Sequence, residues 1–311
     1  MKHFRFLQHA RALSFLTPLI IFQIIFFSSF TAILAQDDDD IIDVDSSVVI
    51  LNATITDKDG KPALGLKESQ FQIFENGVRQ ELAFFETQKS PFSAVILIDT
   101  SGSMEQRVVL ARSAAINFLD RLRPDDNVAI YNFDSDVKLV QEFSNLRDLN
   151  HRAFNLEAKG YTALNDAIYK AAQELSKRRE KRRAIIVLSD GADTRSGKSS
   201  SKALKAALSA NATIYTVDMS SVNTGGRQRM QNQGALKNFA KKSGGVFVKT
   251  PGGVQMRKAF EYIVKELSVQ YTVGYYPSNV KKDGKWRKIE LKLSGKNFDV
   301  RTREGYNARK N

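Results

Sequence analysis

Residues 91–104 read PFSAVILIDTSGSM, and this stretch decides the fold. Residues 92–98 form an almost purely apolar run, which is typical of a strand buried on both faces of a parallel sheet. The run stops at Asp99, and Ser101 and Ser103 follow at intervals of two residues. Side chains two apart in extended backbone point the same way, so three oxygen ligands are expected to converge beyond the strand's carboxyl end. Hard oxygen donors of this kind suit a small divalent cation such as Mg2+.

Strand and helix patterns alternate on the carboxyl side of this stretch. After the strand at 92–98 we expect strands at 127–133, 184–188, 213–218 and 246–249, with a hairpin partner at 137–142. Helices are expected at 106–123, 163–177, 201–210, 235–242 and 254–267, and a weak helix at 146–156. Repeated strand–helix units predict an α/β fold in which a doubly wound, mostly parallel sheet carries helices on both faces.

The segments on either side of this region have the two-residue period of β-structure. Strands are predicted at 47–56, 71–74 and 78–86 before it, and at 268–276, 286–293 and 298–302 after it. The first group is too short to bury a stable core alone. We therefore predict that the α/β domain is inserted in a small β-sandwich built from both chain ends. The predicted domains are a leader at 1–35, an acidic linker at 36–46, β-domain parts at 47–90 and 268–311, and the α/β domain at 91–267.

The D-x-S-x-S pattern of Asp99, Ser101 and Ser103 resembles the metal-ion-dependent adhesion site of von Willebrand factor type A domains. In that family a threonine from a second loop and an aspartate from a third loop complete the site. Thr162, in the sequence KGYT before a helical pattern, matches the second loop, and Asp190, after the apolar run AIIVL, matches the third. The resemblance implies that Asp99, Ser101, Ser103, Thr162 and Asp190 hold Mg2+, with Mn2+ or Ca2+ as alternatives.

The resemblance extends beyond the metal-site motif. The insertion in a β-sandwich resembles integrin β chains, and TDKDGKPALGLKESQFQIFENG at 56–77 resembles the lead-in of bacterial secreted proteins with a type A-related domain. It implies a non-enzymatic protein-binding module whose metal coordinates an Asp or Glu of a partner protein. Two other functions stay open, namely a metal-assisted hydrolase using Asp99 or Asp190 and a structural envelope protein whose metal only stiffens the loops. The partner and the oligomeric state are not predicted.

The amino terminus has the pattern of a secretory signal peptide. Lys2, Arg5 and Arg11 precede a mostly apolar run that ends at Ala35, so we expect an exported protein beginning near Gln36. An uncleaved membrane anchor is the alternative, because the run is long enough to span a bilayer. The leader holds three basic residues and no acidic one, so the rest of the chain carries +10 of the total +13. A basic exported protein is expected to meet acidic partners or an anionic envelope surface, and we expect no nucleic-acid partner.

Two further motifs are not expected to bind a ligand. Residues 177–183, KRREKRR, are expected to form a solvated helix end, where cations are favourable. Residues 192–199, ADTRSGKS, fit a permissive phosphate-binding loop, but the first glycine is replaced by Ala192 and Asp193 would repel phosphate. We therefore do not expect nucleotide binding there.

An aspartyl-phosphate mechanism at Asp99 is not expected either, because such enzymes need a second Asp two residues later and Ser101 occupies that position.

Overall fold

The computed structural model describes residues 48–87, 90–145, 160–220, 226–249, 254–295 and 298–310. The predicted leader, the acidic linker and the weak helix at 146–156 lie outside the described residues. No helix among the described residues is long and apolar enough to cross a membrane.

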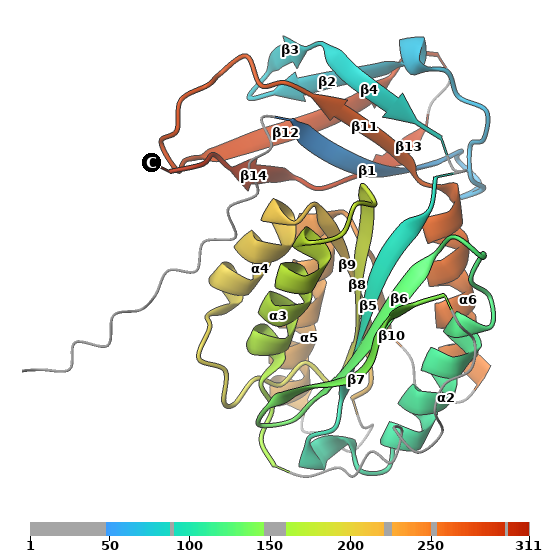
Figure 1. Cartoon of the computed structure of the whole chain (residues 1–311), viewed down its shortest axis with the longest axis vertical. Helices are drawn as coiled ribbons and strands as arrows, with labels where there is room; N and C mark the ends of the chain where they lie inside the picture. Colours follow the sequence, from blue (N-terminus) through green and yellow to red (C-terminus); the bar gives the residue numbers. More distant parts are fainter. Residues whose placement is uncertain are drawn as a thin grey trace, which may run out of the picture. The chain divides into compact units, whose positions relative to one another are not determined.

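The centre of the α/β domain is a six-stranded sheet (Figure 1). Its first five strands are parallel, and the edge strand β7 runs antiparallel to β6. All residues of β5 are buried, as expected for a central strand covered on both faces. The strand order is β10 (Phe247–Lys249), β9 (Ala212–Asp218), β8 (Arg182–Ser189), β5 (Phe92–Asp99), β6 (Asn127–Phe133) and β7 (Val137–Ser144).

Helices cover both faces of this sheet (Figure 1). One face carries α2 (Val108–Leu119) and α6 (Val254–Val269), and the other carries α3 (Leu164–Ser176), α4 (Ser200–Ser209) and α5 (Gly226–Ser243). Because side chains alternate along β5, Ile96 belongs to the first core and Leu97 to the second. Each such side chain contributes about 1.5–3 kcal/mol when fully buried. The unbroken apolar run therefore reflects two cores that share one strand.

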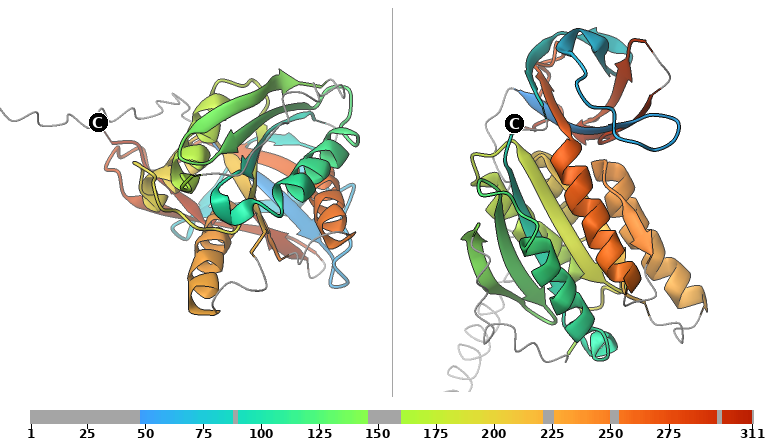
Figure 2. Two further views of the ribbon diagram at one scale, coloured as in Figure 1. Left: turned by 90° about the horizontal axis from the view of Figure 1, so that it is seen from below. Right: turned by 90° about the vertical axis from the view of Figure 1, so that its right-hand side faces the viewer.

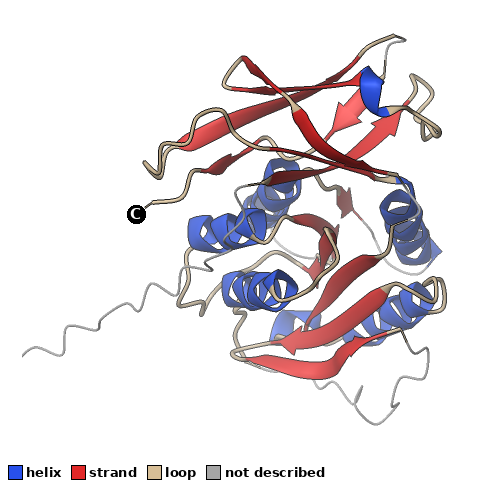
Figure 3. Ribbon diagram, turned by 45° about the horizontal axis from the view of Figure 1, so that its top comes forward, coloured by secondary structure: helices blue, strands red, loops and turns tan. Residues whose placement is uncertain are grey.

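The chain ends form two antiparallel four-stranded sheets that face each other (Figure 3). Strand β1 from the amino-terminal segment pairs with β11 and β13 from the carboxyl-terminal segment, and β2 pairs with β12. The predicted fold class, a doubly wound domain inserted in a composite sandwich, is confirmed. The strand order of one sheet is β13 (Asp299–Arg301), β1 (Val49–Thr56), β11 (Tyr271–Tyr275) and β4 (Leu82–Glu86). The strand order of the other sheet is β14 (Gly305–Asn307), β12 (Trp286–Leu293), β2 (Phe71–Glu75) and β3 (Val78–Gln80).

The prediction of one strand over 78–86 was wrong. The segment divides into β3 and β4, which belong to different sheets. Gln80, at the division, is buried, donates from Nε2 to Ser278 Oγ at 3.0 Å and accepts the Ser278 N–H at 2.9 Å. This contact holds the corner where the chain leaves one sheet for the other, a usual feature of packed sheets.

The basic run at 177–183 was also misjudged as a solvated helix end. Its last two residues lie in β8, and the Arg182 side chain is only 1% exposed. Arg182 donates to the Ser90 carbonyl at 2.5 Å, and burial lowers its pKa to about 10. Arg183 donates to the Ala210 carbonyl at 3.0 Å. The side chains of these two arginines therefore bind backbone carbonyl groups of the folded domain and do not form a solvated helix end.

The chain crossing from the α/β domain to the carboxyl-terminal part of the sandwich is short. Helix α6 runs directly into β11, as the right-hand view of Figure 2 shows. Beside this crossing, Gln270 donates to the Tyr215 hydroxyl at 2.8 Å, and farther along Arg303 donates to the Leu208 carbonyl at 2.8 Å. Buried polar contacts thus connect the α/β domain and the sandwich.

Candidate metal centre

The first loop of the candidate centre follows β5. Asp99 ends the strand fully buried, and its Oδ1 accepts the Ser101 N–H at 2.9 Å. Ser101 is extended, but Ser103 lies in a short 3-10 turn, Gly102–Met104. The expectation of extended backbone through Ser103 was therefore wrong, although the two serine hydroxyls still meet, with their Oγ atoms 3.2 Å apart. The turn brings Ser103 back towards Ser101.

Few hydrogen bonds stabilise the negative charge of the buried Asp99 carboxylate. Its Oδ1 accepts the Ser101 N–H, and its Oδ2 accepts the Ser189 hydroxyl at 2.6 Å. Burial raises the pKa of Asp99 from 3.8 to about 6, and the negative charge of Asp190 adds to the rise, while the bonds from Ser101 and Ser189 oppose it. A positive charge at this position would offset the cost of burying the carboxylate.

The second loop lies against the first. The Gly102 N–H donates to the Gly160 carbonyl at 3.3 Å. Gly160 has a φ of +81°, and a Cβ there would lie 2.8 Å from Ser135 Oγ, which accepts the Tyr161 N–H at 3.1 Å. The next residue, Thr162, is buried. The glycine thus allows the close turn that brings the second loop against the first, just before Thr162.

The third loop follows β8 and completes the arrangement. Asp190 is buried, and its Oδ1 accepts the Ala192 N–H at 2.9 Å. The N–H groups of Thr194 and Arg195 donate to the Thr162 carbonyl at 2.9 and 3.0 Å. Hydrogen bonds therefore join all three loops, and the structure places the five predicted residues at the carboxyl edge of the sheet.

The phosphate-loop pattern at 192–199 has a bracing role. Gly197 and Lys198 donate their N–H groups to the Asp166 carboxylate, both at 2.8 Å. Asp193 accepts the Leu164 N–H at 3.2 Å at the start of α3. Five N–H groups of this loop, counting those of Ala192, Thr194 and Arg195, already have protein acceptors. The loop braces the second metal loop and does not form a phosphate cradle.

Three supporting residues were not predicted from the sequence. Ser189 orients the Asp99 carboxylate, Ser135 holds the Tyr161 N–H, and Asp193 caps α3. Ser189 ends a buried strand directly before Asp190, so its position in the sequence could have indicated a role at the site. Ser135 lies in a turn after β6, and nothing in its local sequence indicates a contact 26 residues away.

The donor set suits a hard divalent cation. Two carboxylates and three hydroxyls come from the three loops, and these are the oxygen ligands that Mg2+ prefers. Among the described residues, no group of three or more His, Cys, Asp or Glu side chains is arranged so that it could hold a metal ion. The buried Asp99 carboxylate, with its raised pKa, fits a site that a cation would neutralise.

The sequence comparison decides the family. The model of the von Willebrand factor type A domain matches residues 94–262, more than half of the chain. The chain belongs to the von Willebrand factor type A family. The type A domain is therefore the α/β domain described above, and the candidate metal centre lies at the carboxyl edge of its sheet.

Curated relatives match the type A domain over part of their length. An uncharacterized protein of Synechocystis sp. is 32% identical over 109 residues, covering 33% of this chain and 26% of that protein. The mouse inter-alpha-trypsin inhibitor heavy chain H3 is 32% identical over 123 residues, covering 35% of this chain and 14% of the heavy chain. The matches thus span about a quarter or less of these relatives.

The solved structures that align with this chain are more distant in sequence. A von Willebrand factor type A protein from Catenulispora acidiphila aligns with a TM-score of 0.48 and 12% identity, covering 80% of this chain and 76% of that one. An aerotolerance-related membrane protein from Bacteroides fragilis aligns with a TM-score of 0.47 and 19% identity, covering 57% of this chain and 98% of that one.

Proposed function

We propose that this protein is an exported, non-enzymatic binding module that recognises an acidic residue of a partner protein through a divalent cation. The observation that carries the proposal is that hydrogen bonds join the three loops beside the end of β5, where the buried Asp99 carboxylate lies. Membership of the type A family supports an interaction role, since these domains are generally interaction modules.

The chain's own groups define what the site could do. The carboxylates of Asp99 and Asp190 and the hydroxyls of Ser101, Ser103 and Thr162 would hold Mg2+ directly or through water. The bound cation would supply Lewis acidity for a carboxylate of the partner, because hydroxyl ligands add no negative charge. A partner lysine or arginine would be repelled, so the site discriminates by charge.

The rim of the site offers contacts for the residues around that carboxylate. Tyr161, next to Thr162, is 62% exposed, and the Arg195 guanidinium lies 5.9 Å from its ring centroid. An exposed aromatic residue beside an arginine is typical of protein-binding surfaces. The net charge of +10 after the leader would also steer acidic partners towards the protein.

The proposal is tested by affinity capture from cell-envelope extracts in Mg2+ and in excess chelator. The bait is the exported chain, compared with the double variant Ser101→Ala/Ser103→Ala and with Ser113→Ala, an exposed control on α2. We expect a partner that is retained by the wild type and the control only in Mg2+. Equal capture of that partner by the folded double variant in chelator would contradict the proposal.

A further inference from the structure

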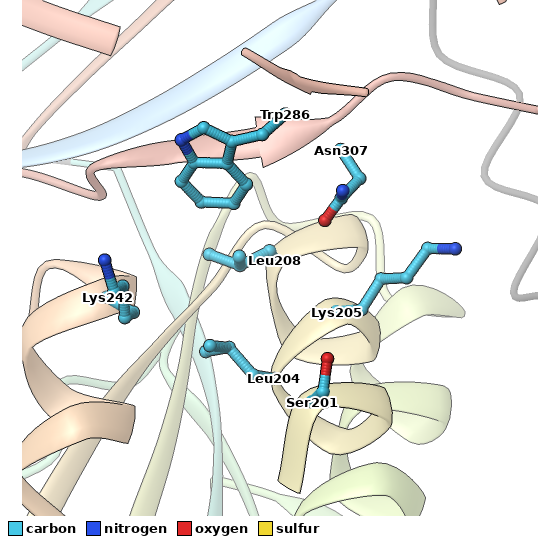
Figure 4. Close-up of a pocket in the computed structure, with 7 residues that line it drawn as sticks. All are labelled: Ser201, Leu204, Lys205, Leu208, Lys242, Trp286 and Asn307. Carbon is cyan, nitrogen blue, oxygen red and sulfur yellow. The ribbon is translucent and has the colours of Figure 1, made fainter. Parts of the chain in front are cut away.

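An open cavity lies where the type A domain meets the sandwich. It has a volume of about 350 Å³ and is lined by side chains of α4, α5, β12 and β14 (Figure 4). None of the five metal-site residues lines it. A volume of this size is at the lower end of the range for small-molecule sites.

The upper wall is an exposed tryptophan held in a defined position. Trp286 is 40% exposed. A Cβ on Gly305 would lie 2.6 Å from its Cζ2 and 2.2 Å from the Arg287 carbonyl, so the indole lies against strand β14 where only a glycine fits. Across the cavity, Leu204 and Leu208 project from α4 towards the ring (Figure 4). The opposing indole and leucines form an apolar slot.

The remaining four lining residues are polar, and two of them are lysines. Lys205 is exposed, and its ammonium group has no carboxylate partner in the described part of the chain. Lys242 pairs with Glu304 at 2.5 Å. Asn307 donates its Nδ2 to the Gly284 carbonyl at 3.2 Å, which leaves its Oδ1 as an acceptor. The free positive charge of the cavity is therefore that of Lys205.

We propose that this cavity binds a small aromatic carboxylate. The ligand's ring lies between Trp286 and the α4 leucines, where offset stacking and apolar burial stabilise it. Its carboxylate pairs with the Lys205 ammonium group after rotation of the lysine side chain, which extends away from Trp286 in Figure 4. A cationic ligand is excluded, since no carboxylate among the lining residues is available to pair with it.

The chain provides its own reporter for this site. Trp286 is the only tryptophan in the sequence, so tryptophan emission reports on the cavity alone. The probe is 3-phenylpropionate, titrated into the full exported chain in chelator, with excitation where tyrosine does not absorb. The uncharged 3-phenylpropionamide is the matched control ligand. We expect a saturable blue shift with the acid, because the ring displaces water from the indole, and weaker binding of the amide.

Charge variants locate the interaction. Lys205→Glu and Lys205→Gln should weaken binding of the acid by about two- to fivefold, the range expected when an exposed ion pair is removed. Lys258→Glu, the same charge change on the exposed side of α6, should leave binding unchanged. Circular dichroism confirms that each variant is folded.

Three results would overturn the proposal: no saturable shift with the acid, equal binding of acid and amide, or wild-type affinity in both Lys205 variants. Because the titration is done in chelator, its result does not depend on the metal centre. Failure here would leave the proposed function unaffected, and loss of partner binding would leave this cavity unaffected.

Discussion

Replacing Asp99 by asparagine should stabilise the metal-free protein while abolishing its metal site. Asparagine has the shape of aspartate without its charge. Its Oδ1 can still accept the Ser101 N–H, and its Nδ2 can donate to Ser189 Oγ, whose hydroxyl is free to rotate. The substitution therefore removes a buried charge and keeps the local hydrogen bonds.

The expected magnitude follows from the pKa of Asp99. Burial raises that pKa from 3.8 to about 6, so the folded state holds the proton more tightly than the unfolded state. The free energy of unfolding therefore falls as pH rises from about 4 to about 6, and the full penalty remains above pH 6. A shift of about two units corresponds to about 3 kcal/mol, and we expect a gain of about 1.5–3 kcal/mol at neutral pH.

Denaturant unfolding in chelator at pH 7.5 and pH 5 measures this gain. The wild type should become more stable relative to Asp99→Asn as pH falls, and Asp299→Asn, at an exposed position on β13, should behave like the wild type. Addition of Mg2+ should stabilise the wild type but not Asp99→Asn. The reasoning is refuted if Asp99→Asn in chelator is no more stable than the wild type at pH 7.5.

Three further predictions concern the fold and its boundaries. Deletion of residues 268–311 should leave β1 and β4 without partner strands and cause aggregation, measured by light scattering, whereas residues 91–267 alone should fold; independent folding of residues 36–90 would contradict the composite sandwich. Gly191→Ala should destabilise the protein by about 1–3 kcal/mol and weaken Mg2+ binding. The reason is that Gly191 has a φ of +84° and that a Cβ there would lie 2.5 Å from the Asn232 carbonyl oxygen. An unchanged thermal unfolding temperature would contradict this prediction. Amino-terminal sequencing of secreted protein should begin near Gln36, and an intact leader in the membrane fraction would favour an anchor.

The fold could be predicted because its signals are local and repeated. The buried strand at 92–98 and the strand–helix alternation after it depend on apolar periodicity, which each segment carries in its own sequence. The two-residue period of the flanking segments likewise predicted β-structure from both ends. The corner between β3 and β4 could not be predicted, because the alternation continues through it and the contact that holds it, Gln80 with Ser278, spans 198 residues.

The three loops of the candidate metal centre show the same difference between local sequence signals and long-range contacts. Asp99, Ser101 and Ser103 form a local motif, and Thr162 and Asp190 were located by resemblance, so all five could be proposed as ligands from the sequence, and this assignment stays a prediction. The contacts that position these residues are not local. Ser135 accepts the Tyr161 N–H of the second loop, and the N–H groups of Thr194 and Arg195 in the third loop donate to the Thr162 carbonyl of the second. The burial of Arg182 was missed for a similar reason, since its acceptor, the Ser90 carbonyl, is 92 residues away.

Direct measurement of metal binding tests the central claim. Isothermal titration calorimetry with Mg2+, supported by electron paramagnetic resonance with Mn2+, should detect a single ion per chain in the exported wild-type protein. The folded double variant Ser101→Ala/Ser103→Ala should bind more than about 100-fold more weakly, since loss of a supporting outer-shell group alone costs about 10- to 100-fold. Wild-type affinity in that double variant, or no metal binding by the wild type, would contradict the account.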